Sequence, residues 1–88
     1  MIQKKSVSKN LSFNEVIKES LNNFLLDHKP HWPKNLYDLV ISEVEKTLLK
    51  LTLEHTTQNK SEAAKILGLN RATLNKKLAK HQLSNTEE

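Results

Sequence analysis

The chain has 88 residues, a net charge of +4 and no cysteine. This length fits one small domain, and the missing cysteines exclude disulfides and cysteine-based metal sites. No apolar stretch approaches the roughly 18 residues that cross a bilayer, so we expect a cytoplasmic protein with no membrane partner. Glycine, proline and aromatic residues are few, and β-branched residues do not alternate with polar ones, which favours an all-α fold.

The chain begins with a polar, lysine-rich segment, and residues 1–11 are therefore expected to be flexible. Ser12 followed by Glu15 forms a capping box, which predicts the start of a helix. Apolar residues then recur at helical spacing. Because Pro30 blocks continuation, this first helix should end near residue 27 or 28 and be followed by a loop.

The longest periodic run covers residues 35–56, with Asn35 in the position of an N-cap. Its two neighbouring apolar stripes offer more apolar surface than one short partner helix covers. We therefore expect a homodimer, while a monomer that buries this helix under its own other helices is the alternative. The stripes consist of Leu36, Val40, Val44, Leu48 and Leu51, and of Tyr37, Ile41, Leu49 and Leu53.

Two short helices are predicted after this run. Asn59 and Glu62 form a second capping box, and the helix behind them stops at Gly68, the only glycine of the chain. Asn70 then caps a further helix, in which leucines face inward. A glycine turn between two such helices, with a small residue such as Ala64 where they cross, predicts a helix-turn-helix.

The basic residues are concentrated around this motif, because residues 59–81 hold six basic residues and one acid. Such a segment on an otherwise balanced chain indicates a polyanionic partner. In helix-turn-helix proteins the start of the second helix enters the major groove of double-stranded DNA, where arginine contacts guanine most readily. Other polar side chains hold phosphates, and helix N-termini offer free amides. The candidate DNA-binding residues are Asn59, Asn70, Arg71, Thr73, Asn75, Lys76, Lys77 and Lys80.

The segment NKSEAAKILGLNRATLNKKLAKHQL resembles the C-terminal helix-turn-helix of the Fis family, the factor for inversion stimulation, and that of NtrC-type activators. The segment LYDLVISEVEKTLLKLTLEHT resembles the long second helix of Fis. The similarity runs from about residue 13 to residue 83. It implies an intertwined homodimer with four helices in each chain, which binds and bends DNA, organises the bacterial nucleoid and regulates promoters. RNA polymerase is then a further candidate partner.

The resemblance also assigns roles to residues. Arg71 matches the guanine-contacting arginine of the family, and Lys76 and Lys77 match its basic clamp on the DNA backbone. Asn75 and Ala79 replace an arginine and a lysine that are usual in Fis, which leaves room for a different base preference and affinity. The resemblance further implies phosphate contacts for Asn59 and Ser61, and places Asn70, Arg71 and Thr73 at the start of the recognition helix.

Four parts are predicted along the chain. Residues 1–11 form a flexible tail, residues 12–56 a helical dimerisation core, residues 57–83 the DNA-binding helix-turn-helix and residues 84–88 an acidic tail. About twelve residues precede the first helix, too few for the β-hairpin with which Fis proteins contact an invertase, so recombination enhancement is not expected.

Two other functions remain open. The chain could be a stand-alone NtrC-like DNA-binding domain with a narrow target set, or a helical interaction module whose basic hairpin only covers a core. An enzyme is not expected, because the sequence contains no arrangement typical of nucleophilic or acid-base catalysis. Neither a cofactor nor a small-molecule ligand is expected. A metal site is not expected either, because His28 and His31 flank a proline and this spacing gives metal ligands no fixed geometry.

Overall fold

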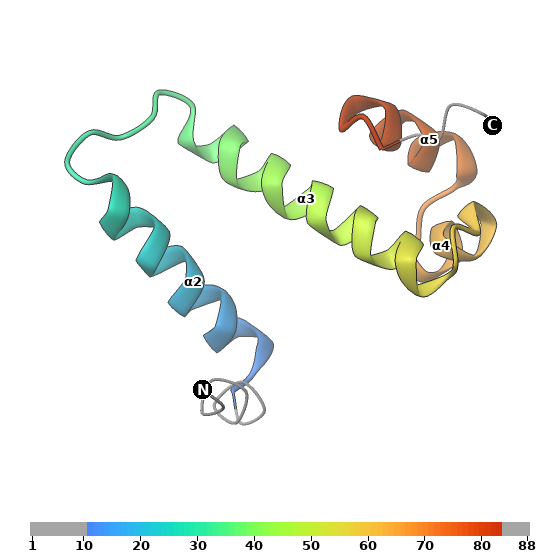
Figure 1. Ribbon diagram of the computed structural model, residues 1–88, viewed down its shortest axis with the longest axis horizontal. Helices are drawn as coiled ribbons and strands as arrows, with labels where there is room; N and C mark the ends of the chain where they lie inside the picture. Colours follow the sequence, from blue (N-terminus) through green and yellow to red (C-terminus); the bar gives the residue numbers. More distant parts are fainter. Residues whose placement is uncertain (1–10, 84–88) are drawn as a thin grey trace. The chain divides into compact units, whose positions relative to one another are not determined.

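The computed structural model describes residues 11–83, which form four α-helices and no strand, as expected for an all-α fold (Figure 1). The predicted tail over 84–88, and that over 1–11 apart from Leu11, lie outside these residues. The chain divides into two units, residues 1–34 and residues 35–88, and each is described by itself. The first unit contains α2 (Phe13–His28), and the second contains α3 (Leu36–His55), α4 (Lys60–Leu67) and α5 (Arg71–Lys80).

Helix α2 starts and ends through local interactions. Ser12 Oγ accepts a hydrogen bond from the Glu15 backbone N–H at 3.1 Å, and the Glu15 carboxylate accepts one from the Ser12 N–H at 3.0 Å. The predicted capping box is therefore complete. At the other end, Lys29 adopts an extended conformation ahead of Pro30, as steric restriction before proline requires. No residue of α2 is buried.

Helix α3 lies within the predicted range, and only its C-terminal half contributes to a core. Leu49, Thr52 and Leu53 are buried, and Thr52 Oγ1 donates a hydrogen bond to the Leu48 carbonyl at 2.8 Å, which offsets the cost of burying a hydroxyl. Asn35 is at the N-cap position as predicted, but its side chain makes no capping hydrogen bond. The backbone there has φ −113° and ψ 56°, outside the extended conformation from which a side chain normally caps a helix.

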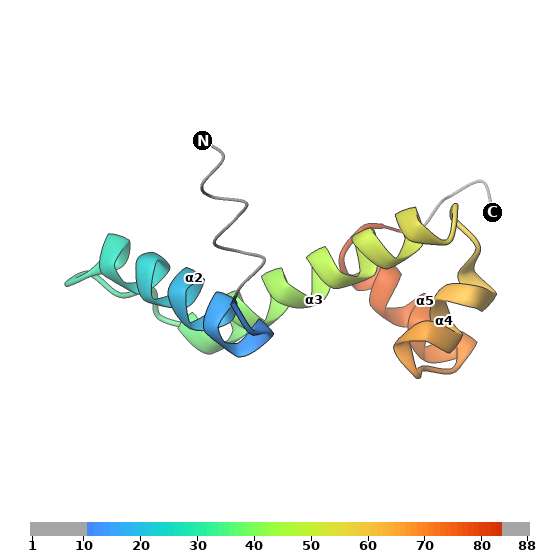
Figure 2. The same ribbon diagram turned by 90° about the horizontal axis from the view of Figure 1, so that it is seen from below.

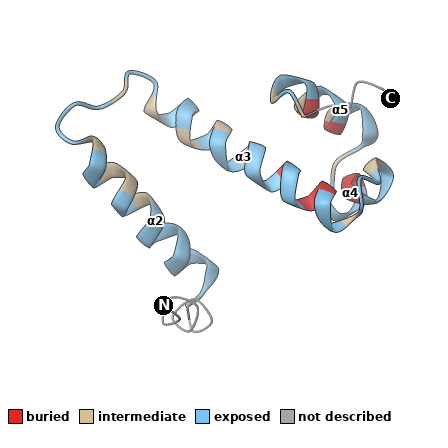
Figure 3. Ribbon diagram, viewed as in Figure 1, coloured by how far each residue is buried: buried red, intermediate tan, exposed pale blue. Residues whose placement is uncertain are grey.

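The core of the second unit is small and joins all three of its helices (Figure 1, Figure 2). The two alanines of α4 are buried, and such small side chains let helices approach closely. Figure 3 shows these buried positions near the C-terminal end of α3 and on the facing sides of α4 and α5. The core consists of Leu49, Leu53, Ala63, Ala64, Leu74 and Leu78, with Leu67, Leu69 and Leu83 packed against it.

Gly68 ends α4 as predicted, in the left-handed conformation with φ +75°. Its N–H donates hydrogen bonds to the carbonyls of Ala64 and Lys65, and the Leu69 N–H donates one to the Ala64 carbonyl at 2.9 Å. These bonds satisfy carbonyls that the end of a helix leaves free. No atom lies within 4 Å of the position that a Cβ would take, so glycine is required by backbone conformation and not by space.

The connection between α3 and α4 also uses the left-handed conformation, here without glycine. Thr57 has φ 55° and Gln58 has φ 66°. This conformation is uncommon for any residue other than glycine and a genuine outlier for β-branched threonine. The turn is held by backbone bonds, among them that from the Gln58 N–H to the Leu53 carbonyl at 2.7 Å.

Candidate nucleic-acid interface

The start of α4 forms one half of the predicted capping box. Asn59 Oδ1 accepts a hydrogen bond from the Glu62 N–H at 3.1 Å. The reciprocal half does not form, because the Asn59 N–H donates instead to the Thr56 carbonyl at 3.1 Å. The prediction of a helix start at Asn59 is thus confirmed. The predicted second capping box is incomplete, because only one of its two hydrogen bonds forms.

The start of α5 is fixed by Asn70, whose Oδ1 accepts a hydrogen bond from the Thr73 N–H at 2.8 Å. The cap leaves the amide NH₂ of Asn70 as a side-chain donor. Thr73 is half-buried behind it. The first N–H groups of a helix have no partner within the helix, so this end of α5 presents donors and a partial positive charge.

Arg71 connects the starts of the two helices, since its Nη1 donates a hydrogen bond to Ser61 Oγ at 2.8 Å. Both side chains are exposed, and they are ten residues apart in the sequence. Serine is neutral, so this contact orients the guanidinium group without neutralising its charge. The structure therefore brings together Ser61 and Arg71, which the sequence analysis assigned to the same function.

An open hollow of about 420 Å³ lies beside this pair. Its lining adds Lys60, a basic residue that the sequence analysis did not single out. The position directly after the N-cap Asn59 was the available indication, because a lysine there lies at a helix start. The residues that line the hollow are Leu53, Gln58, Asn59, Lys60, Ser61, Arg71 and Leu83.

Helix α5 has an inner and an outer side. Leu74 and Leu78 are fully buried on the inner side. The outer side carries two of the predicted DNA-binding residues, Asn75 and Lys76, both exposed. The next lysine along the chain, Lys77, is half-buried beside the leucines. The two adjacent lysines of the predicted backbone clamp therefore differ in their surroundings.

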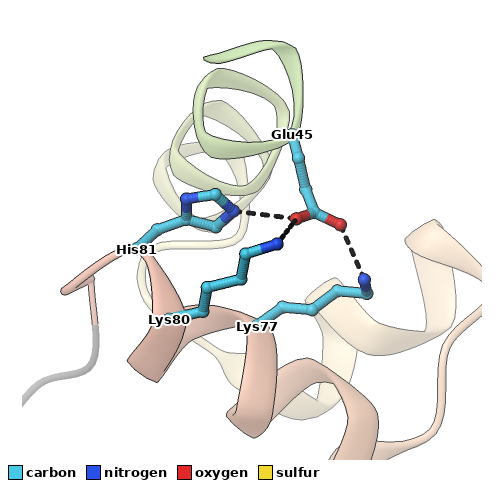
Figure 4. Close-up of polar contacts among 4 residues, drawn as sticks. All are labelled: Glu45, Lys77, Lys80 and His81. Carbon is cyan, nitrogen blue, oxygen red and sulfur yellow. Dashed lines mark hydrogen bonds and ion pairs between the residues drawn. The ribbon is translucent and has the colours of Figure 1, made fainter. Parts of the chain in front are cut away.

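Glu45 of α3 joins the inner side of α5 through a polar cluster (Figure 4). Its Oε2 lies 2.7 Å from Lys77 Nζ, and its Oε1 lies 2.8 Å from His81 Nε2 and 3.8 Å from Lys80 Nζ. The hydrogen bonds from Lys77 and then His81 lower the pKa of Glu45 to about 2, although burial opposes this. The role of Glu45 was not predicted from the sequence, because its closest partners lie 32 and 36 residues away.

The histidines differ in their surroundings. The side chain of His81 is 6% exposed, whereas His55 is exposed. The His28 ring contacts the Phe24 carbonyl through Nδ1 at 2.9 Å. Among residues 11–83, no three possible metal ligands come together, and no helix has the length and apolar character needed to cross a membrane.

Comparison with known proteins covers both units. The sequence profile described as "Bacterial regulatory protein, Fis family" matches residues 40–81. The protein named "DNA-binding protein Fis" from Buchnera aphidicola subsp. Schizaphis graminum is 43% identical over 83 residues, which are 93% of this chain and 82% of that protein. The proteins of the same name from Glaesserella parasuis serovar 5 and Aliivibrio fischeri are 42% and 41% identical, over 76% and 77% of this chain and 68% and 69% of their own lengths. The chain belongs to the Fis family.

Proposed function

We propose that this protein is a transcriptional regulator that binds double-stranded DNA as a homodimer and bends it. The observation that carries the proposal is the arrangement of α5. Buried leucines hold one side of the helix against the core, while its capped start and its outer side present asparagine, arginine and lysine. This is the arrangement that a recognition helix needs, because its N-terminal residues contact bases while its other side stays packed.

Two groups of side chains have different roles in this proposal. Arg71 and Asn70 contact base edges, with Arg71 suited to guanine because its two outer nitrogens match the guanine acceptors. Lys76, Asn59 and Ser61 contact phosphates and fix the register of the protein on the duplex. The charge of Lys60 adds to this surface, since it lines the same hollow as Arg71. Asn75, Thr73 and Lys80 are further candidate contacts.

Exposed apolar residues on α3 support the homodimer. Val44 and Leu48 are 57% and 51% exposed, and they follow one another at helical spacing. A row of large apolar side chains in water is unfavourable, and the same row from a second copy covers it without any further partner. Sedimentation should give about twice the 10.1 kDa of one chain. A folded monomer at micromolar concentration would contradict this. The exposed residues of the row are Tyr37, Ile41, Val44, Leu48 and Leu51.

DNA bending follows from the membership of the Fis family together with the dimer. Successive major grooves on one face of straight DNA lie about 34 Å apart. We infer that the two recognition helices of this dimer are closer, as in the family it resembles, so that both enter only when the duplex curves. Energy transfer between dyes at the two ends of a duplex measures this curvature. Unchanged transfer on binding, with equal affinity for A·T-rich and G·C-rich centres, would leave an unbent complex.

The test of DNA binding itself is the dependence of affinity on salt. Fluorescence anisotropy with a labelled duplex should show tight binding at low salt and a linear fall of log K with log salt concentration. Arg71→Ala should reduce the preference for a specific site, whereas Lys76→Ala should weaken binding to all sequences about equally. No binding at low salt would favour the helical interaction module.

The long similarity to Fis proteins, over 83 residues, supports a Fis-type regulator above an NtrC-like domain. Association with the bacterial nucleoid in the cytoplasm and contact with RNA polymerase are part of the proposal.

A further inference from the structure

We propose that Glu45 is a positioning residue of the recognition helix, which fixes the orientation of α5 on α3 and withholds Lys77 from the DNA backbone. This inference rests on the DNA binding proposed above. It assigns opposite roles to the adjacent lysines of α5, with Lys76 contacting phosphate and Lys77 serving α3. Glu45 would then lower the affinity for DNA of any sequence and raise the preference for a specific site.

The two oxygens of the Glu45 carboxylate hold α5 at two positions. Oε2 accepts from Lys77 at 2.7 Å, and Oε1 contacts His81 at 2.8 Å. These partners are four residues apart and lie on the same side of α5, about one helical turn from each other. Leu78, fully buried, lies between them in the sequence. The core alone holds α5 by apolar contacts, which are non-directional, whereas two hydrogen bonds to one carboxylate oppose rotation of the helix about its axis.

Lys77 and Glu45 form an ion pair in which both side chains are partly shielded from water. The side chain of Lys77 is 34% exposed and that of Glu45 is 23% exposed. Moving the ammonium group to DNA would leave this carboxylate partly buried and without its closest partner, and such a loss is costly. Lys80 differs, because its side chain is 61% exposed and its nitrogen is 3.8 Å from Glu45. Lys80 therefore remains able to reach DNA, whereas Lys77 stays paired with Glu45.

The first experiment compares Glu45→Gln with Glu43→Gln. Both variants remove one negative charge from α3 and keep the size of the side chain, but Glu43 is exposed and makes no ion pair in the described part of the chain. Affinity for a random duplex and for a duplex with a specific site is measured by anisotropy over a series of salt concentrations. Relative to E43Q, E45Q should bind random DNA several-fold more tightly at low salt. The slope of log K against log salt should become steeper by about one, as expected for one released lysine.

The ratio of specific to random affinity should fall in E45Q and stay unchanged in E43Q. A purely structural role for Glu45 gives a different result, in which E45Q weakens binding to both duplexes and the salt slope does not steepen. That result would overturn the inference. Failure of the proposed function is distinguishable, because the unmodified protein would then show no salt-dependent DNA binding at all.

A second experiment uses the two lysines, and its single variants do not depend on how well E45Q folds. Lys76→Gln should reduce the salt slope by about one, while Lys77→Gln should leave the slope of the unmodified protein unchanged. Combined with E45Q, K77Q should remove the extra slope that E45Q creates. Thermal unfolding followed by circular dichroism confirms that each variant is folded at the assay temperature. Equal reductions of the slope by K76Q and K77Q would show that Lys77 contacts phosphate and would refute the proposal.

Discussion

Helices α2 and α5 differ in where their stability comes from. Helix α2 has 16 residues and a complete capping box, yet buries none of its side chains. Helix α5 has only 10 residues and a single side-chain cap, yet two of its leucines are fully buried. Isolated helices of these lengths are marginal in water, so packing decides which of them persists. Local sequence defines where a helix begins, whereas tertiary contacts determine how stable it is.

The strongest test of whether packing determines stability places a charge on the row of exposed apolar residues of α3. In the proposed dimer Val44 is covered by the second copy, so Val44→Lys should cost about 3–5 kcal/mol, as expected for a buried charge without a partner. Chemical denaturation followed by circular dichroism measures this cost, and sedimentation should show loss of the dimer. A change below about 0.5 kcal/mol would mean that Val44 stays exposed, as in the single chain.

The next test concerns the core that holds α5. Leu78→Ala should reduce the free energy of unfolding by about 3 kcal/mol, because it removes a fully buried side chain and leaves a cavity. The matched control is Ile66→Ala on α4, where the side chain is 65% exposed and the loss should be below about 1 kcal/mol. Similar losses in the two variants would show that burial within the single chain does not determine stability.

Acid should weaken the attachment of α5 to α3. The folded state lowers the pKa of Glu45 from 4.5 to about 2, mainly through Lys77, so the folded protein holds this carboxylate ionised more strongly than the unfolded chain does. The resulting stability is present above pH 4.5 and is lost as the pH falls towards 2. We expect a loss of about 1–2 kcal/mol from these charged hydrogen bonds. Urea denaturation at several pH values should show it, and E45Q should flatten this part of the profile.

The smallest effects are expected at the caps. Ser12→Ala and Asn70→Ala each remove a side chain that accepts from a backbone N–H, and each should cost about 1 kcal/mol or less. Hydrogen exchange separates the two. Ser12→Ala should speed exchange only in the first turn of α2, whereas Asn70→Ala should also speed it in α3 and α4, which share a core with α5. Identical local patterns would mean that α5 is no more cooperative than α2.

The sequence predicted those features of the fold that depend on neighbouring residues. Ser12, Asn70 and Gly68 each act within a few residues of their own position, and the structure confirms all three. Asn35 is also at its predicted N-cap position, but its side chain does not cap the helix, because capping requires a backbone conformation that the sequence of the loop did not specify. The stop at Gly68 and the small residue Ala64 where the helices cross together allowed a helix-turn-helix to be predicted.

Features that depend on distant residues were not predicted. The hydrogen bond from Arg71 to Ser61 and the cluster around Glu45 join residues 10 to 36 positions apart. Nothing in the local pattern distinguishes Glu45 from Glu43, although one is bound by α5 and the other is exposed. The difference arises because α5 packs on α3 beside Glu45, and this contact between segments distant in the sequence has no local signal.

Gly68 has a consequence for the chemistry of side chains at this turn. Its φ of +75° strains an L side chain, although no atom lies within 4 Å of the position that the Cβ of an L residue would take. A D-amino acid prefers positive φ by mirror symmetry, so D-alanine introduced by chemical synthesis would adopt this backbone conformation without strain. D-Alanine should also restrict the unfolded chain more than glycine does and so stabilise the turn by up to about 1 kcal/mol. The backbone between α4 and α5 thus favours the opposite handedness, and a D-cysteine at this site would give the turn an attachment point for a spectroscopic label.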